Sequence, residues 1–166
     1  IPAPACEEFA FARLSAEDCE RAYPLELALD AHMTRSPTFM LRPSESLESF
    51  RESVARPESK LFAAFSGDLA VAHLKIERAG ETFACAAPDY IHINGAYTLP
   101  GFRGRGVIQG LINRAIRALR PEGYVRLGVD FESINPIAYR TWLRYFEAYT
   151  DGLVRRIDEN ALRRGR

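Results

Sequence analysis

The 166-residue sequence lacks a long hydrophobic run, an excess of charge of one sign and a regular spacing of cysteines. No stretch approaches the ~18 apolar residues of a membrane-spanning helix, so we expect no membrane partner. Three cysteines without the spacing of metal ligands predict reduced thiols, no bound metal and a cytoplasmic location. Basic and acidic residues balance at 22 each, and no basic–aromatic alternation occurs, which argues against nucleic-acid binding.

Internal repeats and internal changes of composition are absent as well, and the length predicts one full-sized domain. We expect residues 1–7, which are rich in proline and alanine, to be a linker or a trimmed end. Residues 8–158 are expected to form the domain and residues 159–166 a basic tail. The start at Ile1 is compatible with a piece of a longer chain or with processing, and a homodimer is compatible with the sequence.

Alternating and helical hydrophobic patterns predict the secondary structure. The expected strands are Glu8–Leu14, Lys60–Phe65, Leu69–Glu77, Tyr90–Leu99, Tyr124–Phe131 and Tyr149–Ile157. The expected helices are Ala16–Ala31, Leu47–Ala55, Ile108–Leu119 and Asn135–Phe146. Antiparallel strands followed by strand–helix–strand crossovers predict the α/β class, with a mixed α+β sheet of about six to seven strands flanked by four helices.

Charge is unevenly spread although it sums to zero. Residues 1–30 carry seven acidic residues against two arginines, whereas residues 101–126 carry six arginines against one glutamate. The positive stretch contains the turn "GFRGRG", which directly precedes an amphipathic helix. A helix N-terminus has unpaired N–H groups and about half a positive charge, so the turn predicts an anion cradle. A plain tight turn with surface arginines is the alternative.

Two common phosphate motifs do not fit this turn. A P-loop needs lysine after its last glycine, where this chain has Val107. A dinucleotide fingerprint needs G-x-G-x-x-G in the first strand–helix unit, whereas here three residues separate Gly106 from Gly110 and the turn follows a hairpin.

The segment Arg103–Ile108, after Thr98-Leu99-Pro100, resembles the R-x-x-G-x-G/A motif by which the GNAT superfamily of N-acetyltransferases binds acetyl-CoA. The resemblance continues through a strand and Asn135-x-x-Ala138 at the start of a helix, and the ending "DFES.NP.A…WL.YF…VRRID" is similar to a less-studied branch of that superfamily. It implies the GNAT fold, acetyl-CoA as cosubstrate, and direct attack of a primary amine on the thioester. The implied acceptor is a small molecule or a peptide.

The resemblance also implies roles for backbone groups. Those of Ala96, Tyr97 and Thr98 would hold the pantetheine arm and polarise the thioester carbonyl, where the strand parts from its parallel neighbour. The pyrophosphate would lie against the amides of Arg103, Gly104, Arg105, Gly106, Val107 and Ile108. Asn135 would contact the arm, or serve only as a helix cap. Two positions depart from the pattern: Ile108 replaces glycine or alanine, and Trp142 replaces the tyrosine that protonates the departing sulfur.

The resemblance therefore does not assign the catalytic base and acid. His92 is the candidate base, since it titrates near neutral pH and shares a strand face with Asn94 and Ala96 in a regular strand. Glu132, at a strand end, is a second candidate, and Asp89 and Asp130 compete with it. Tyr139 is the candidate acid; it and Tyr145 lie three residues either side of Trp142 on one predicted helix face. The alternative to an enzyme is a non-catalytic CoA-binding or sensor domain of the same fold.

Overall fold

The computed structural model describes residues 8–35, 38–40, 44–78, 80 and 87–152, and in them a single five-stranded sheet follows the order of the chain. The strands are β1 (Ala10–Leu14), β2 (Lys60–Ser66), β3 (Leu69–Glu77), β4 (Tyr90–Thr98) and β5 (Arg126–Val129). The helices are α1 (Tyr23–Met33), α2 (Leu47–Ala55), α3 (Val107–Leu119) and α4 (Pro136–Trp142). Strands β1 to β4 pair antiparallel and β5 joins β4 in parallel, so the predicted mixed sheet is confirmed.

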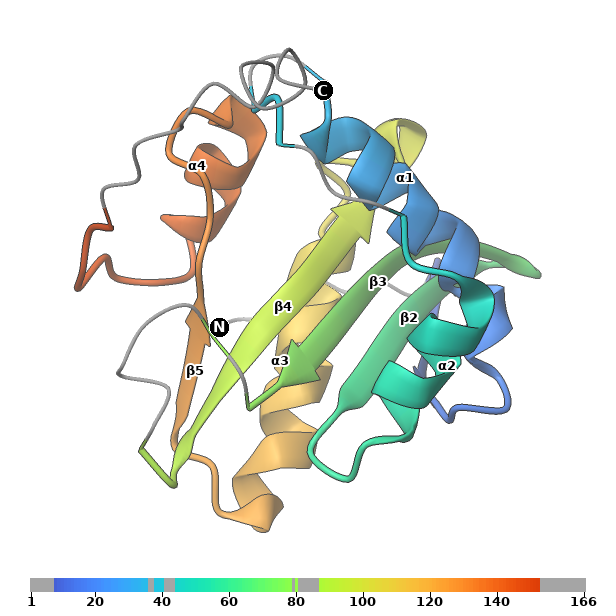
Figure 1. The fold of residues 1–166 in the computed structure, drawn as a ribbon, viewed down its shortest axis with the longest axis horizontal. Helices are drawn as coiled ribbons and strands as arrows, with labels where there is room; N and C mark the ends of the chain where they lie inside the picture. Colours follow the sequence, from blue (N-terminus) through green and yellow to red (C-terminus); the bar gives the residue numbers. More distant parts are fainter. Residues whose placement is uncertain (1–7, 36–37, 41–43, 79, 81–86, 153–166) are drawn as a thin grey trace, which may run out of the picture.

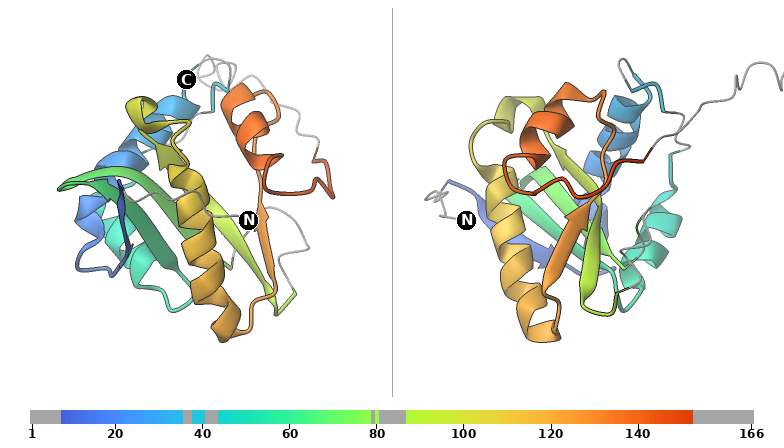
Figure 2. Two further views of the ribbon diagram at one scale, coloured as in Figure 1. Left: turned by 180° about the vertical axis from the view of Figure 1, so that it is seen from behind. Right: turned by 90° about the vertical axis from the view of Figure 1, so that its left-hand side faces the viewer.

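The sheet is buried on both faces. Helices α1 and α2 cover the face nearer the viewer in Figure 1, and α3 covers the other, as the reversed view in Figure 2 shows. Strand β2 illustrates the alternation: Phe62 packs into the core on the α3 side, whereas Leu61 and Phe65 pack against α1 and α2. Two packed layers around one sheet give this chain two apolar clusters instead of one.

Local signals placed several elements correctly. Helix α2 has the predicted bounds, and the Ser46 hydroxyl caps it by accepting a hydrogen bond of 3.1 Å from the Ser49 N–H. The β2–β3 hairpin is confirmed, with Gly67 in the left-handed region at its turn (φ 59°). Among the described residues, none of the helices has the length and apolar content needed to cross a lipid bilayer.

The first helix begins at Tyr23 rather than at the predicted Ala16. Pro24 explains the difference, because proline lacks an N–H and clashes with the preceding turn unless it lies in the first turn of a helix. The residues before it, Cys19–Arg21, form a separate 3₁₀ turn.

The C-terminal elements are shorter than predicted. Helix α4 ends at Trp142, and the N–H groups of Tyr145 and Phe146 turn back onto the Trp142 carbonyl (2.9 and 2.8 Å). Tyr139 and Tyr145 therefore do not share a helix face, which corrects that expectation. Residues 149–152 lie in no strand, and the rest of the predicted strand Tyr149–Ile157 falls outside the described residues, as do residues 1–7 and the predicted tail.

Candidate functional site at the parting of β4 and β5

The two parallel strands are paired over only part of their length. Residues Tyr90–Ile93 of β4 pair with Arg126–Val129 of β5, and β5 ends there. Strand β4 continues through Asn94–Thr98 without β5 beside it, and Figure 1 shows the two strands diverging towards the end of β4. On that edge, the backbone groups of Ala96, Tyr97 and Thr98 are not paired with β5. The sequence analysis expects the pantetheine arm to bind to these groups.

A β-bulge interrupts β4 at this point. Ile93 lies opposite Ile76, whereas Gly95 lies opposite the preceding residue, Lys75, so Asn94 is the extra residue. The inserted residue reverses the alternation of side chains along the strand. Ala96 consequently packs with Ile93 in the core on the α3 side. The expectation that Ala96 shares a face with His92 is therefore wrong.

The glycine turn has the conformation that its sequence requires. Gly104 (φ 75°) and Gly106 (φ 77°) both occupy the left-handed region, which other residues reach at a cost of about 1–2 kcal/mol. Gly106 is the N-cap residue of α3, and the first helical hydrogen bond is donated by the Gly110 N–H to its carbonyl (2.9 Å). The N–H groups of Val107 and Ile108 therefore precede the hydrogen-bonded part of the helix. The partly buried Ile108 side chain packs against the core on the α3 side.

The two arginines of the turn point in different directions. Arg103 donates from Nε to the Thr98 carbonyl (3.0 Å), and its guanidinium lies 5.5 Å from the centre of the Tyr97 ring. It thereby ties the turn to the free half of β4. Arg105 forms an ion pair with Glu8 and stacks over Phe9, so it ties the turn to the start of the domain.

Asn135 caps α4 and also contacts α1. Its Oδ1 accepts hydrogen bonds from the N–H groups of Ile137 and Ala138 (3.2 and 3.3 Å). Its Nδ2 lies 3.4 Å from Nε2 of His32, in the last turn of α1, and the His32 ring is 6.1 Å from the Tyr97 ring. Burial, followed by the charges of Arg103 and Arg35, lowers the pKa of His32. Three distant segments therefore meet at His32 beside the open half of β4.

His92 is placed on the other side of the bulge, within the paired part of β4. Its side chain is almost completely buried, its Nε2 lies 3.0 Å from Oδ2 of Asp130, and Tyr90 stacks on its ring. Burial lowers the pKa of His92, and the Asp130 carboxylate opposes that effect. Since Asp130 directly follows β5, the His92–Asp130 pair lies at the point where β4 and β5 begin to diverge.

The remaining catalytic candidates, Glu132 and Tyr139, and the position of the missing tyrosine, Trp142, lie in α4 or just before it. Tyr139 is exposed and meets Phe131 edge to face, with 6.1 Å between the ring centres. Trp142 is buried in the core on the α3 side and packs edge-on against Phe146. Glu132 lies in the turn before α4, where its backbone carbonyl accepts from the Asn135 N–H (2.9 Å). Glu132 and Tyr139 therefore lie at α4, whereas His92 lies within the paired part of β4.

A buried carboxylate lies beneath the bulge on the face covered by α1. Oε2 of Glu26 is 2.9 Å from Nε2 of His73, and both side chains are at least nine-tenths buried. A Cβ on Gly95 would stand 3.5 Å from that same carboxylate oxygen. Burial raises the pKa of nearby Glu45; Lys75 opposes that rise, and the carboxylates around it, Glu26 first, support it. The α1 side of the bulge is thus predominantly acidic.

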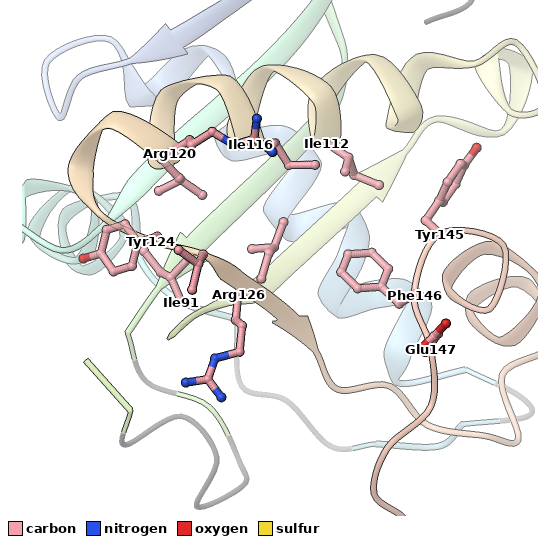
Figure 3. Close-up of a pocket in the computed structure, with 12 residues that line it drawn as sticks. Ile91, Ile112, Ile116, Arg120, Tyr124, Arg126, Tyr145, Phe146 and Glu147 are labelled. Atoms are coloured by element: carbon pink, nitrogen blue, oxygen red, sulfur yellow. The ribbon is translucent and has the colours of Figure 1, made fainter. Parts of the chain in front are cut away.

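A cavity of about 520 Å³ lies elsewhere, between the C-terminal half of α3 and β5. Ile112 and Ile116 of α3 point into it towards Ile91, and Tyr145 and Phe146 close one end (Figure 3). Its walls are mainly apolar and do not include the glycine turn. We therefore assign it no part in anion binding.

A mixed sheet whose parallel pair opens beside a glycine-lined helix N-terminus is the arrangement of the acyl-CoA N-acyltransferase fold class. The model of the acetyltransferase (GNAT) family matches residues 27–147, so the chain belongs to that family and the resemblance seen in the sequence is confirmed. No curated protein sequence matches the chain significantly.

Solved structures share the fold at low sequence identity. Aminoglycoside N-acetyltransferase AAC(6')-Iy in complex with CoA is 19% identical over 90% of this chain and 95% of that chain, with a TM-score of 0.71. Aminoglycoside acetyltransferase meta-AAC0020 from an uncultured soil metagenomic sample is 12% identical over 93% and 97%, with a TM-score of 0.71. Ribosomal-protein-alanine N-acetyltransferase from Brucella melitensis biovar Abortus 2308 is 14% identical over 89% and 98%, with a TM-score of 0.65.

Sequence reasoning missed His32 and Glu26, which no motif marks. His32 lies in a segment without a periodic signal, and its partner Asn135 is 103 residues away along the chain. Glu26 follows the helical pattern of α1. The one sequence signal of its burial beneath β4 is that Glu26 and Asp30 lie on the same side of that helix as the apolar Leu25 and Leu29.

Proposed function

We propose that the protein is an N-acetyltransferase that transfers the acetyl group of acetyl-CoA to a primary amine by direct attack. The observation that carries this proposal is the parting of β4 from β5 beside a helix N-terminus whose turn holds two left-handed glycines. A thioester cosubstrate supplies the activated acyl group when bound. The protein then has to hold the phosphates of the cosubstrate, orient the thioester carbonyl and remove a proton from the amine.

The residues present fit coenzyme A. The N–H groups of the glycine turn from Gly104 to Ile108 are suited to the pyrophosphate because they precede the first bonded turn of α3, whereas the Arg103 N–H already donates to the Pro100 carbonyl (3.3 Å). Backbone groups of Ala96, Tyr97 and Thr98 on the open edge of β4 can pair with the amide-rich pantetheine arm as a neighbouring strand would. An aimed backbone N–H at a carbonyl that gains negative charge contributes roughly 3–4 kcal/mol in enzymes.

The acceptor is proposed to be a cationic amine of a small molecule or a peptide. Glu26, Glu45 and Glu77 make the α1 side of the bulge acidic, which favours an ammonium group over an anion. By their names, proteins with the same fold acetylate aminoglycosides and the alanine of a ribosomal protein. Amine acceptors of these two kinds support the proposal of a small-molecule or peptide amine. His92, Glu132 and Tyr139 remain predictions as catalytic groups, and Asn135 remains one as a contact of the pantetheine arm.

Calorimetry with acetyl-CoA tests the cradle, using Gly106→Ala against Gly101→Ala. An alanine at 106 has to adopt φ 77°, whereas a Cβ at 101 meets no atom within 4 Å and the backbone there is not left-handed. We expect Gly106→Ala to weaken binding about tenfold, equivalent to about 1.4 kcal/mol, and Gly101→Ala to change it less than twofold. Equal affinities for both variants would rule out the cradle.

A non-catalytic CoA-binding domain is the second candidate, because Trp142, buried at the end of α4, lacks the acidity of the tyrosine it replaces. Release of free thiol from acetyl-CoA with a panel of amines separates the two. Turnover with any amine supports the enzyme. Binding of acetyl-CoA without turnover across polyamines, aminoglycosides and N-terminal peptides supports the second candidate.

A further inference from the structure

The side chain of Arg103 connects the glycine turn to the open edge of β4. Its Nε donates to the Thr98 carbonyl (3.0 Å), and its guanidinium lies 5.5 Å from the centre of the Tyr97 ring. Thr98 is the last residue of β4, and the chain passes from it through the turn directly into α3 (Figure 2). The contact therefore joins the two parts of the candidate site, which are the anion cradle and the strand edge.

The Thr98 carbonyl points away from β3. The next residue, Leu99, donates its N–H to the Val71 carbonyl of β3 (2.9 Å). Thr98 lies opposite Ala72 in the same register. Residues along an antiparallel pair alternate between those that hydrogen-bond to the partner strand and those that do not. The backbone groups of Thr98 are of the second kind and point to the edge that β5 leaves open, so Arg103 binds on that edge.

The turn itself consists largely of glycine, whose backbone is the most permissive of all residues. A Cβ added at Gly101 or Gly104 would meet no atom within 4 Å, so the backbone of the turn is not held by close packing at these positions. Its arginine side chains hold it instead, in two directions. Arg105 reaches the start of the domain, whereas Arg103 reaches β4. The distance between the cradle and the strand edge therefore depends on Arg103.

We propose that Arg103 is a positioning residue that couples the anion cradle to the edge of β4 and thereby sets where along the strand the thioester of a bound cosubstrate lies. This inference rests on the proposed function. The side chain acts through the Thr98 carbonyl and needs no contact with a phosphate. A cradle that shifts relative to β4 would displace the thioester carbonyl from the backbone N–H groups of the edge. A misplacement of about 1 Å can lower an enzymatic rate about 100-fold.

Two fragments of the cosubstrate separate this role from direct phosphate binding. ADP carries the pyrophosphate without the arm, and S-acetylpantetheine carries the arm and the thioester without the phosphates. Each fragment uses only one part of the site, so the coupling between the parts does not affect it. Acetyl-CoA uses both parts, so the loss of Arg103 should impair its turnover more than the binding or turnover of either fragment.

Arg103→Met and Arg105→Met form a matched pair, because each removes one positive charge and one guanidinium from the same turn. We expect kcat with acetyl-CoA, measured with the fastest amine of the panel, to be about tenfold or more lower in Arg103→Met than in Arg105→Met. The Kd for ADP and the kcat/KM for S-acetylpantetheine should agree within threefold between the two variants. Arg117→Met, on the exposed side of α3, should match the wild type in all three measurements.

Three results would overturn the inference. An ADP affinity at least tenfold weaker in Arg103→Met than in Arg105→Met would make Arg103 a phosphate ligand. A loss of S-acetylpantetheine turnover as large as the loss of acetyl-CoA turnover would confine its action to β4. Equal kcat values for the two variants with acetyl-CoA would show that the contact with Thr98 has no part in the reaction.

Urea denaturation shows whether the variants are folded. If Arg103→Met is unstable, Arg103→Lys repeats the comparison with the charge retained, because lysine lacks the planar guanidinium that donates from Nε while it lies over an aromatic ring. We then expect the same fall in kcat with acetyl-CoA and a Kd for ADP within twofold of the wild type. A kcat within threefold of the wild type in Arg103→Lys would overturn the inference.

The outcomes also separate this inference from the proposed function. If the wild type does not bind acetyl-CoA, or binds it without turnover of any amine, the proposed function fails and this inference fails with it. If the wild type turns over and the folded Arg103 variants keep its kcat within threefold, the function stands and Arg103 does not position the cosubstrate.

Discussion

Replacing Gly110 by alanine should lower stability when Phe11 faces it and raise stability when residue 11 is alanine. A Cβ at Gly110 would stand 2.4 Å from Cζ and 2.7 Å from Cε1 of Phe11, so the ring of β1 has to move. Arg114 lies 4.8 Å above that ring and restrains it. Alanine in a helix interior gains about 1 kcal/mol over glycine, whereas overpacking costs about 1–3 kcal/mol. The expected net loss for Gly110→Ala is about 1 kcal/mol of unfolding free energy.

In a Phe11→Ala background the clash is gone and only the helix preference remains. Gly110→Ala should then raise the free energy of unfolding by about 1 kcal/mol, which makes the coupling between the two positions about 2 kcal/mol. Urea denaturation of the wild type, both single variants and the double variant measures it, provided that the slopes agree. Arg117→Ala, on the exposed side of α3, serves as the control and should change stability by less than about 0.5 kcal/mol. A coupling below about 0.5 kcal/mol would show that the Phe11 ring yields without cost.

Three further outcomes are expected. Acidification below about pH 6.5 should destabilise the wild type more than His92→Gln. Burial lowers the pKa of His92 from its usual 6.5, so the stability that its neutral form gives is present above that pH and lost as the pH falls; equal slopes in urea titrations at several pH values would contradict this. Ser46→Ala should cost about 1 kcal/mol in thermal unfolding through loss of the α2 cap. Arg105→Gln should cost less than about 1 kcal/mol, because its pair with Glu8 is well exposed, yet weaken acetyl-CoA binding severalfold by calorimetry.

The parts of the fold that the sequence predicts are those set by short-range chemistry. A Gly-Asp hairpin turn and a glycine turn before an amphipathic stripe predict the β2–β3 pair and α3 with little error, and the helical pattern predicts the bounds of α2. The Asn135 cap is of the same kind, because its acceptor serves N–H groups two and three residues ahead. In each case the atoms that decide the structure belong to neighbouring residues.

The errors arise where distant segments decide the structure. The bulge at Asn94 depends on how β4 pairs with β3, and no pattern within β4 reveals it. The same holds for the site. The glycine turn can be recognised as a motif in the sequence, whereas the contact between His32 and Asn135 forms only because α1 ends beside the cap of α4. Burial of His92 against Asp130 likewise follows from strand pairing.

The bulge in β4 leaves the pairing with β3 consistent on both of its sides. Ile93 lies opposite Ile76 and Gly95 lies opposite Lys75, so a chain without Asn94 would keep the other residues of β4 opposite the same partners and on the same faces of the sheet. Straightening β4 with Asn94 still in place would instead turn one half of the strand over, and Tyr97 would enter the core beside α3. A deletion of Asn94 is therefore compatible with the fold, whereas an unbulged strand of the present length is not.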